Sequence, residues 1–119
     1  MSRYILVVED EPAIRFVYQE YLADLGFPVR AAENGESALG VKGQPAPSLA
    51  LVDLNLPGMS GVEVIRALNG LHPRMPVVVI SANPRARQEV ARAAVRVEGI
   101  LEKPIDLEQL GVLARRYLG

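Results

Sequence analysis

The chain has 119 residues, of which half are hydrophobic and 23% are charged, with a formal net charge of -1. This composition fits one ordinary globular domain, and the near-neutral charge gives no field that favours nucleic acid or a membrane surface. The absence of cysteine excludes disulfides, thiol catalysis and thiolate metal sites, and no apolar run approaches the ~20 residues that a membrane span needs.

The first predicted elements are a strand and an amphipathic helix. The strand covers Arg3–Asp10, whose early acidic residues also distinguish it from a signal peptide. Pro12 suits the first position of the following helix, and Gly26 suits the left-handed residue that ends it. The apolar stripe of this helix, at steps of three and four residues, consists of Ile14, Val17, Tyr18, Tyr21, Leu22 and Leu25.

A short second unit and a third strand follow. The second strand is predicted over Pro28–Glu33, and Asn34 is placed to cap a small helix that ends in the loop Lys42–Pro47. The third strand covers Ser48–Leu54. Ser60 and Glu63 have the spacing of a capping box. The residues of the following helix that are predicted to face the core are Val64, Ile65, Leu68 and Leu71.

The last third of the chain repeats the alternation twice. The fourth strand, Pro76–Ala82, is the most continuously apolar, and Asn83-Pro84 is predicted to cap and start a helix that runs to about Val95. A weaker strand over Gly99–Lys103 precedes a helix that begins near Asp106. The inward residues of this last helix are Leu107, Leu110, Leu113, Ala114 and Tyr117.

Five repeats of strand then helix predict an α/β fold. Near-continuous apolar strands that alternate with helices indicate a parallel sheet covered on both faces. The sequence shows no linker, low-complexity segment or internal repeat. We therefore expect a single domain over residues 1–119, with no second domain in this chain.

Polar residues fall where the predicted strands end. The first strand ends in Glu9 and Asp10, the third in Asp53, the fourth in Ser81 and the fifth in Lys103. Ligands of open parallel sheets gather at the carboxyl ends of the strands. If the first and third strands are neighbours, three carboxylates converge there, with a hydroxyl and an ammonium group nearby.

Three close carboxylates require a cation, since otherwise one of them stays protonated. Hard oxygen ligands without histidine or cysteine select Mg²⁺, Mn²⁺ or Ca²⁺, and a small site with room for water and phosphate fits Mg²⁺ best. Such a site suits acceptance of a phosphoryl group: Asp53 attacks in line, the metal and Lys103 neutralise the equatorial oxygens, and Ser81 donates a hydrogen bond. A strand-end aspartate by itself is more often a helix cap or a solvated turn residue. The matching acidic and basic groups at the other strand ends favour the functional interpretation.

The residues at these strand ends resemble the receiver domain of two-component response regulators. The resemblance lies in "VVEDEP" around Glu9 and Asp10, "LVDLNLPGMSG" around Asp53, "ISA" with Ser81, and "LEKP" with Lys103. It covers the chain from Arg3 to about Leu118. It implies a flavodoxin-like (βα)5 domain whose parallel strands have the order 2-1-3-4-5.

The resemblance also implies a function and a set of site residues. Asp53 would be phosphorylated from a histidine kinase or histidine phosphotransferase, and the phosphoprotein would then change its binding to a downstream protein that the sequence does not identify. Mg²⁺, or Mn²⁺ as the alternative, would be bound by Asp10, Asp53 and the backbone carbonyl of Asn55, with Glu9 in support. Asn55 and Asn83 hold the variable positions that tune slow self-dephosphorylation. The domain would be cytoplasmic, catalysing only its own aspartyl chemistry, with no direct nucleic-acid or membrane binding.

The sequence departs from the family at the switch position, where most members have an aromatic residue. Ile100 stands where the family has tyrosine or phenylalanine, Ile105 replaces a frequent phenylalanine, and Arg96-Val97 replaces a small pair. Isoleucine is β-branched and has no polar tip, so it cannot present a phenol to a partner. A pseudo-receiver scaffold with weakened switching is therefore the alternative function.

Two other activities of similar folds fit less well. A phosphatase of the haloacid-dehalogenase type needs an acid at the position of Asn55, and the "EDEPA" segment would repel the phosphate of a flavin. The resemblance implies that exposed residues near Arg15 dock the phosphodonor. Arg85, Arg92 and Arg96 are predicted on one side of the fourth helix, as a solvated face or as a docking surface for an acidic partner, and a homodimer through this helix stays open.

Overall fold

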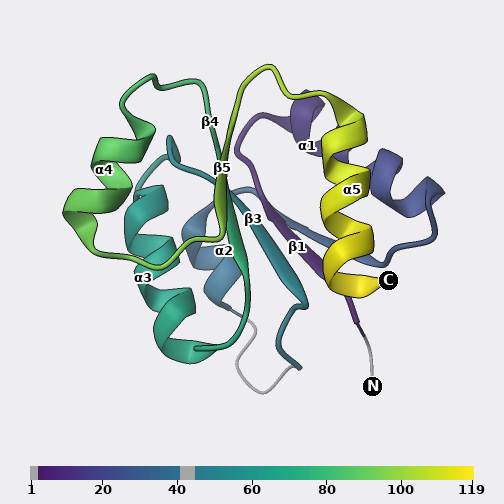
Figure 1. Cartoon of the computed structure of the whole chain (residues 1–119), viewed down its shortest axis with the longest axis horizontal. Coiled ribbons are helices and arrows are strands. Elements are labelled where there is room, and N and C mark those ends of the chain that lie inside the picture. Colours follow the sequence, from purple (N-terminus) through teal and green to yellow (C-terminus); the bar gives the residue numbers. More distant parts are fainter. Residues whose placement is uncertain (1–2, 41–44) are drawn as a thin grey trace.

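The computed structural model describes residues 3–40 and 45–119, and within them it forms one parallel sheet of order β2-β1-β3-β4-β5 (Figure 1). The predicted fold class and strand order are confirmed. The strands are β1 (Ile5–Val8), β2 (Val29–Ala32), β3 (Leu49–Asp53), β4 (Val77–Ser81) and β5 (Gly99–Glu102). The helices are α1 (Pro12–Asp24), α2 (Gly35–Leu39), α3 (Gly61–Leu71), α4 (Ala86–Ala93) and α5 (Leu107–Leu118). Part of the predicted loop Lys42–Pro47, up to Gln44, lies outside the described residues.

Helices cover both faces of the sheet, as the apolar strands predict. Helices α2, α3 and α4 lie on one side, and α1 and α5 lie on the other (Figure 1). All four residues of β1 are buried because they alternate between the hydrophobic cores on the two faces of the sheet. Leu6 and Val8 face the core under α2, α3 and α4, and Ile5 and Val7 face the core under α1 and α5. No helix in the described ranges is long and apolar enough to cross a membrane.

The register of the sheet aligns the carboxyl ends of its central strands. Val8 pairs with Val52, which pairs with Val79 of the next strand. The residues that follow these pairs therefore meet at one edge.

Several helix ends follow their sequence signals. Pro12 stands at the start of α1, and Gly26 follows that helix with a φ of 94°. The side chain of Asn34 accepts a hydrogen bond from Ser37 N at 2.8 Å. Asp106 and Gln109 form a reciprocal capping box at α5. At α3, Ser60 Oγ accepts from Glu63 N as predicted, but the two side chains bond to each other instead of completing the box.

The predicted start of the fourth helix is wrong. The Oδ1 atom of Asn83 accepts a hydrogen bond from Arg85 N at 2.9 Å, only two residues along the chain, so this segment forms a turn before the helix begins at Ala86. The helix ends at Ala93, because Ala94 adopts a left-handed conformation with φ 54°. Arg96 therefore lies beyond the helix and not on its side.

Three residues of the predicted apolar stripes are exposed. Val17 is 45% exposed because it lies about 100° around α1 from the buried Tyr18. Leu25, at 36%, and Leu71, at 51%, stand at helix ends, where the helix face no longer lies over the sheet. The other predicted inward residues of α3, namely Val64, Ile65 and Leu68, are buried.

Candidate functional site

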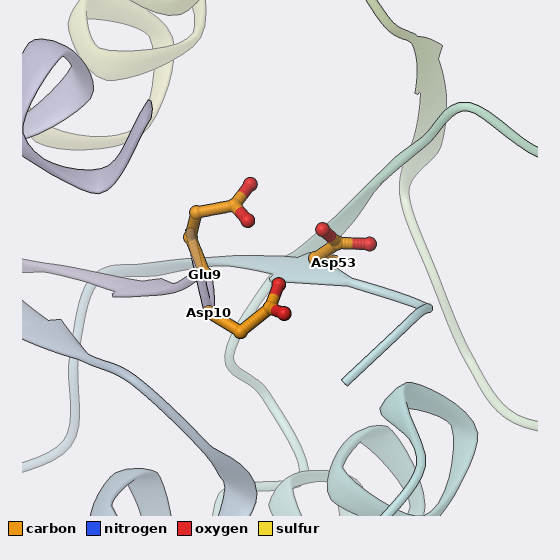
Figure 2. A group of neighbouring side chains, drawn as sticks. All are labelled: Glu9, Asp10 and Asp53. Atoms are coloured by element: carbon orange, nitrogen blue, oxygen red, sulfur yellow. The ribbon is translucent and has the colours of Figure 1, made fainter. Parts of the chain in front are cut away.

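Three carboxylates meet at the carboxyl edge of the sheet. Glu9, Asp10 and Asp53 each place one carboxylate oxygen within 4.8 Å of the others (Figure 2). Glu9 is 1% exposed and Asp53 is 4% exposed, whereas Asp10 is only partly buried. The structure thus brings together the acidic residues that the strand ends predict.

Lys103 joins two of these carboxylates. Its Nζ atom lies 2.7 Å from Glu9 Oε1 and 2.8 Å from Asp53 Oδ2. These two contacts are the only ion pairs among residues 3–40 and 45–119. The lysine follows β5, and its peptide bond to Pro104 is cis. Burial lowers the pKa of Lys103, but the hydrogen bonds and negative charges of Asp53 and Glu9 outweigh burial and raise it above its ordinary value. The group stays an ammonium ion.

Glu9 lies in an environment that opposes its charge. Burial raises the pKa of Glu9, although hydrogen bonds from Lys103 and from the backbone N–H of Glu11, at 3.2 Å, act in the opposite direction. The nearby charge of Asp53 also raises the pKa of Glu9. A cation beside these groups therefore stabilises the ionised state of Glu9.

The carboxylate of Asp53 is held at both oxygens. Lys103 donates to Oδ2, and the backbone N–H of Asn55 donates to Oδ1 at 2.9 Å. Because Asp53 is the last residue of β3, its backbone is fixed by the sheet. The side chain of Asn55 is exposed. The site therefore presents an oriented carboxylate at the end of a rigid strand.

Gly61 has a contact that the sequence motif alone does not reveal. A Cβ atom at this position would lie 2.4 Å from Leu54 Cα and 2.5 Å from the carbonyl oxygen of Asp53. Its N–H donates to Leu54 O at 3.1 Å. The start of α3 thus packs directly against the backbone that carries Asp53. The glycine within "PGMSG" is the only sequence signal of this contact.

Ser81 and Asn83 connect the site to α4. Ser81 is buried at the end of β4, and its Oγ accepts from Asn83 N at 3.0 Å, which leaves the hydroxyl proton for donation. Asn83 Nδ2 donates to Glu89 Oε1 at 2.6 Å. Ile100 is partly buried and packs against the core between the sheet and α2, α3 and α4. Sequence reasoning did not find the contact of Asn83 with Glu89.

Arg15 supports the loop that carries the first two acids. Its Nη1 atom donates to the carbonyl oxygens of Glu9, at 2.9 Å, and Asp10, at 3.3 Å. The sequence suggested only a docking role for the surroundings of this residue. The guanidinium group holds the end of β1 against α1, so both carboxylates start from a fixed backbone.

The charges of the site match a divalent cation. Three carboxylates face one ammonium group, and Asp10 forms no ion pair with a described residue. If all four groups are ionised, the cluster carries two negative charges, and its ligand atoms are the hard oxygens that Mg²⁺ and Mn²⁺ prefer. The residues present therefore fit such an ion.

Comparisons with known proteins agree with the geometry. The profile of the response regulator receiver domain family matches residues 5–115. The DNA-binding transcriptional regulator NtrC of Salmonella typhimurium is 29% identical over 119 residues, which cover 99% of this chain and 25% of NtrC. The response regulator MprA of Mycobacterium tuberculosis is 33% identical over 118 residues, which cover 99% of this chain and 51% of MprA. The chain thus spans a quarter to a half of the length of these two relatives.

A solved structure of similar length shows the same architecture. The receiver domain of NtrX from Brucella abortus superposes with a TM-score of 0.84 at 33% sequence identity, and the alignment covers 96% of this chain and 97% of that domain.

Proposed function

The chain belongs to the response regulator receiver domain family, and from this membership we propose that it is a phosphorylation-switched module of a two-component system. Asp53 accepts a phosphoryl group from a histidine kinase or a histidine phosphotransferase, and the phosphorylated domain changes its binding to a downstream protein. Residues 1–119 act as one receiver domain, located in the cytoplasm.

The observation that carries this proposal is the position of Lys103 between Glu9 and Asp53, at 2.7 and 2.8 Å. In the reaction, an Asp53 oxygen forms the bond to phosphorus while the bond from phosphorus to the donor's imidazole nitrogen breaks, and the nitrogen keeps that electron pair. The Lys103 ammonium group holds the carboxylate in orientation and then donates to a phosphoryl oxygen. Ser81 lies at the end of the next strand and is only 1% exposed. Its hydroxyl donates a hydrogen bond to another phosphoryl oxygen.

The acidic cluster supports a Mg²⁺ requirement. Asp10, Asp53 and the backbone carbonyl of Asn55 would hold the ion, with Glu9 in support, and Mn²⁺ has the same ligand preference. When bound, the ion supplies positive charge to the phosphoryl oxygens. Asn55 and Asn83 carry amides, which neither take nor give a proton at neutral pH, so they supply no acid or base for attack by water. Slow self-dephosphorylation follows.

The surface beside Lys103 fits a phosphodonor. A cavity of about 510 Å³ lies next to this lysine, with Ile14, Val17 and Tyr18 of α1 on one side and Pro104 and Ile105 on the other. On the same helix, Phe16 is 63% exposed and Val17, which lines the cavity, is 45% exposed. An exposed apolar surface beside a reactive group suits the docking of a helical partner that carries the phosphohistidine.

The test is intact mass after incubation with acetyl phosphate and Mg²⁺. The wild type should gain one phosphoryl group, and Asp53→Asn should gain none. Asp24→Asn, which removes an exposed carboxylate at the end of α1, serves as the matched control and should behave as the wild type. No mass gain in the wild type, or a gain that survives Asp53→Asn, would overturn the assignment.

A further inference from the structure

A second cavity lies at the edge of the sheet opposite the acidic site. It has a volume of about 560 Å³, and its lining includes Arg3, Ser48 and Pro76, which precede β1, β3 and β4. Because parallel strands begin at the same edge, this edge is opposite to Asp53 at the end of β3. The turn after α3 and the end of α5 also border it, at the lower side of Figure 1. We call this space the amino-edge cavity.

The lining of the amino-edge cavity combines positive charge with apolar surface. Arg3, Arg74 and His72 line it, and none of its described lining residues carries a carboxylate, although the whole chain has a formal net charge of -1. Leu71, which is 51% exposed, and the half-buried ring of Tyr117 supply apolar surface. Sites for small molecules have this mixed character and volumes of about 300–1,000 Å³.

The helix ends at this edge account for one of the two arginines. The dipoles at the carboxyl ends of α3 and α5 favour a cation. Arg3 fits this role, because its Nη1 atom donates to Leu118 O at 3.0 Å. Arg74 lies beyond α3, three residues after Leu71, and the dipole effect falls off within the last turn. Within the described ranges Arg74 forms no ion pair, so its charge remains available to a ligand.

A tight turn fixes the wall of the cavity that carries His72 and Arg74. Met75 N donates to His72 O at 3.0 Å, and Pro73 occupies the second position of this turn, which proline favours. The guanidinium group of Arg96 also donates to the carbonyl oxygen of Pro73. Since the backbone of this wall is already ordered, a ligand loses little binding free energy to ordering it.

We propose that the amino-edge cavity binds a small organic anion, which consists of a phosphate or carboxylate group on an apolar body. The guanidinium groups of Arg3 and Arg74 match both head groups in charge and geometry, and the hydroxyl of Ser48 is a further donor. Leu71 and Tyr117 contact the apolar body. An inorganic anion leaves this apolar surface in water, and an uncharged aromatic molecule leaves the arginines without a partner.

The experiment is an NMR titration of the 119-residue chain without Mg²⁺, using 1-naphthyl phosphate, 1-naphthoate, 1-naphthol and inorganic phosphate as probes. A naphthyl anion that binds with ordinary efficiency for its size has a Kd of about 0.5 mM. The readout is the imidazole C2 proton of His72, the only histidine in the sequence, together with the amide signals of Arg74 and Tyr117. Both naphthyl anions should shift these signals, and the tighter of the two identifies the head group. 1-Naphthol and inorganic phosphate should each bind at least about fivefold more weakly.

Substitutions separate the charge of the cavity from its apolar surface. Arg74→Gln should weaken the binding of 1-naphthyl phosphate about fivefold. Arg87→Gln removes the same charge from an exposed position in the first turn of α4, outside the cavity, and as the matched control it should weaken binding less than twofold. Leu71→Ala, at an exposed position, should weaken the binding of both naphthyl anions but not that of inorganic phosphate.

The outcomes distinguish this site from phosphorylation and from other surfaces. Asp53→Asn should bind 1-naphthyl phosphate as the wild type does, so a failure of phosphorylation leaves this result unaffected. The proposal is overturned if the His72 signal does not shift at about 10 mM 1-naphthyl phosphate, or if the shift changes centre on Lys103 and Ile105. It is also overturned if 1-naphthol or inorganic phosphate binds as tightly as the naphthyl anions, or if Arg74→Gln and Arg87→Gln weaken binding equally. Tighter binding of a peptide of ten glutamates would indicate a protein-binding surface instead.

Discussion

Gly61 provides a direct test of how the start of α3 fixes the strand that carries Asp53. In Gly61→Ala, the new methyl group would meet Leu54 Cα at 2.4 Å and Asp53 O at 2.5 Å. Ordinary carbon contacts are about 3.5–4.0 Å, so the backbone after β3 or the helix must move by about 1 Å. Both neighbours are backbone atoms, which cannot move aside by changing a rotamer.

The magnitude follows from opposing terms. Overpacking against fixed atoms costs about 1–3 kcal/mol, or more where nothing can yield. Replacing glycine by alanine recovers about 0.4–1 kcal/mol through the unfolded chain. Because both close neighbours of Gly61 are backbone atoms, the cost lies at or above the upper end of its range. We therefore expect Gly61→Ala to lower the free energy of unfolding by about 2–3 kcal/mol, which corresponds to roughly 10 °C in melting temperature for a chain of this length.

Two other glycines give a graded series. A Cβ at Gly70, within α3, meets nothing within 4 Å, so Gly70→Ala should raise the free energy of unfolding by about 0.5–1 kcal/mol. A Cβ at Gly35 meets Val64 Cγ2 at 2.6 Å and Met59 Sδ at 3.0 Å. These are side-chain atoms, and methionine is adaptable, so Gly35→Ala should lie between the other two variants.

The assay is urea unfolding followed by circular dichroism, with the denaturant slope compared among the three variants. The phosphorylation rate of Gly61→Ala with acetyl phosphate should also fall, because the carbonyl of Asp53 is one of the two atoms displaced. The packing argument is refuted if the free energy of unfolding of Gly61→Ala lies within about 0.5 kcal/mol of the wild-type value. It is also refuted if Gly70→Ala is destabilised as much as Gly61→Ala.

Two further predictions concern the charges and the switch position. Lys103→Met should lower the free energy of unfolding by about 2–4 kcal/mol at neutral pH without Mg²⁺, because it leaves the buried Glu9 and Asp53 without their ammonium partner. Urea unfolding measures this loss, and added Mg²⁺ should restore part of it. An unchanged urea midpoint without Mg²⁺ would contradict this account. Phosphorylation should change amide NMR shifts strongly near Ser81 and weakly near Ile100, because Ile100 already packs against the core and has no polar tip to redirect; equally large changes at both positions would count against weakened coupling.

The strands were predictable because the parallel sheet is buried on both faces. Each apolar run marks a strand, but the predicted bounds extend one or two residues too far, as in Arg3–Asp10 against Ile5–Val8. Most of the extra residues, such as Arg3, Glu9 and Asp10, are polar, and the sequence alone does not show at which residue the hydrogen-bonded ladder stops. The start of α4 was missed because Asn83 can cap either a helix or a turn, and its bond to Arg85 N selects the turn.

The meeting of the site residues was predictable from one rule about strand ends, whereas their supporting contacts were not. The rule brings together residues that follow the central strands. The bonds of Arg15 to the carbonyls of Glu9 and Asp10 depend on the direction of a long side chain. The close approach of Gly61 to Asp53 depends on how α3 packs. Neither leaves a periodic signal in the sequence.

The neighbouring positions of Glu9 and Asp10 show how two adjacent acids take different roles. Both residues follow the end of β1, and Figure 2 shows their carboxylates pointing apart beside Asp53, that of Glu9 above and that of Asp10 below in this view. Glu9 reaches Lys103 at 2.7 Å, while Asp10 forms no ion pair within the described ranges. The lysine thus neutralises the part of the cluster on the side of Glu9 and leaves the side of Asp10 negative. That side is where a divalent ion gains most, which is the electrostatic basis for assigning Asp10, and not Glu9, as the principal acidic partner of Asp53 in metal binding.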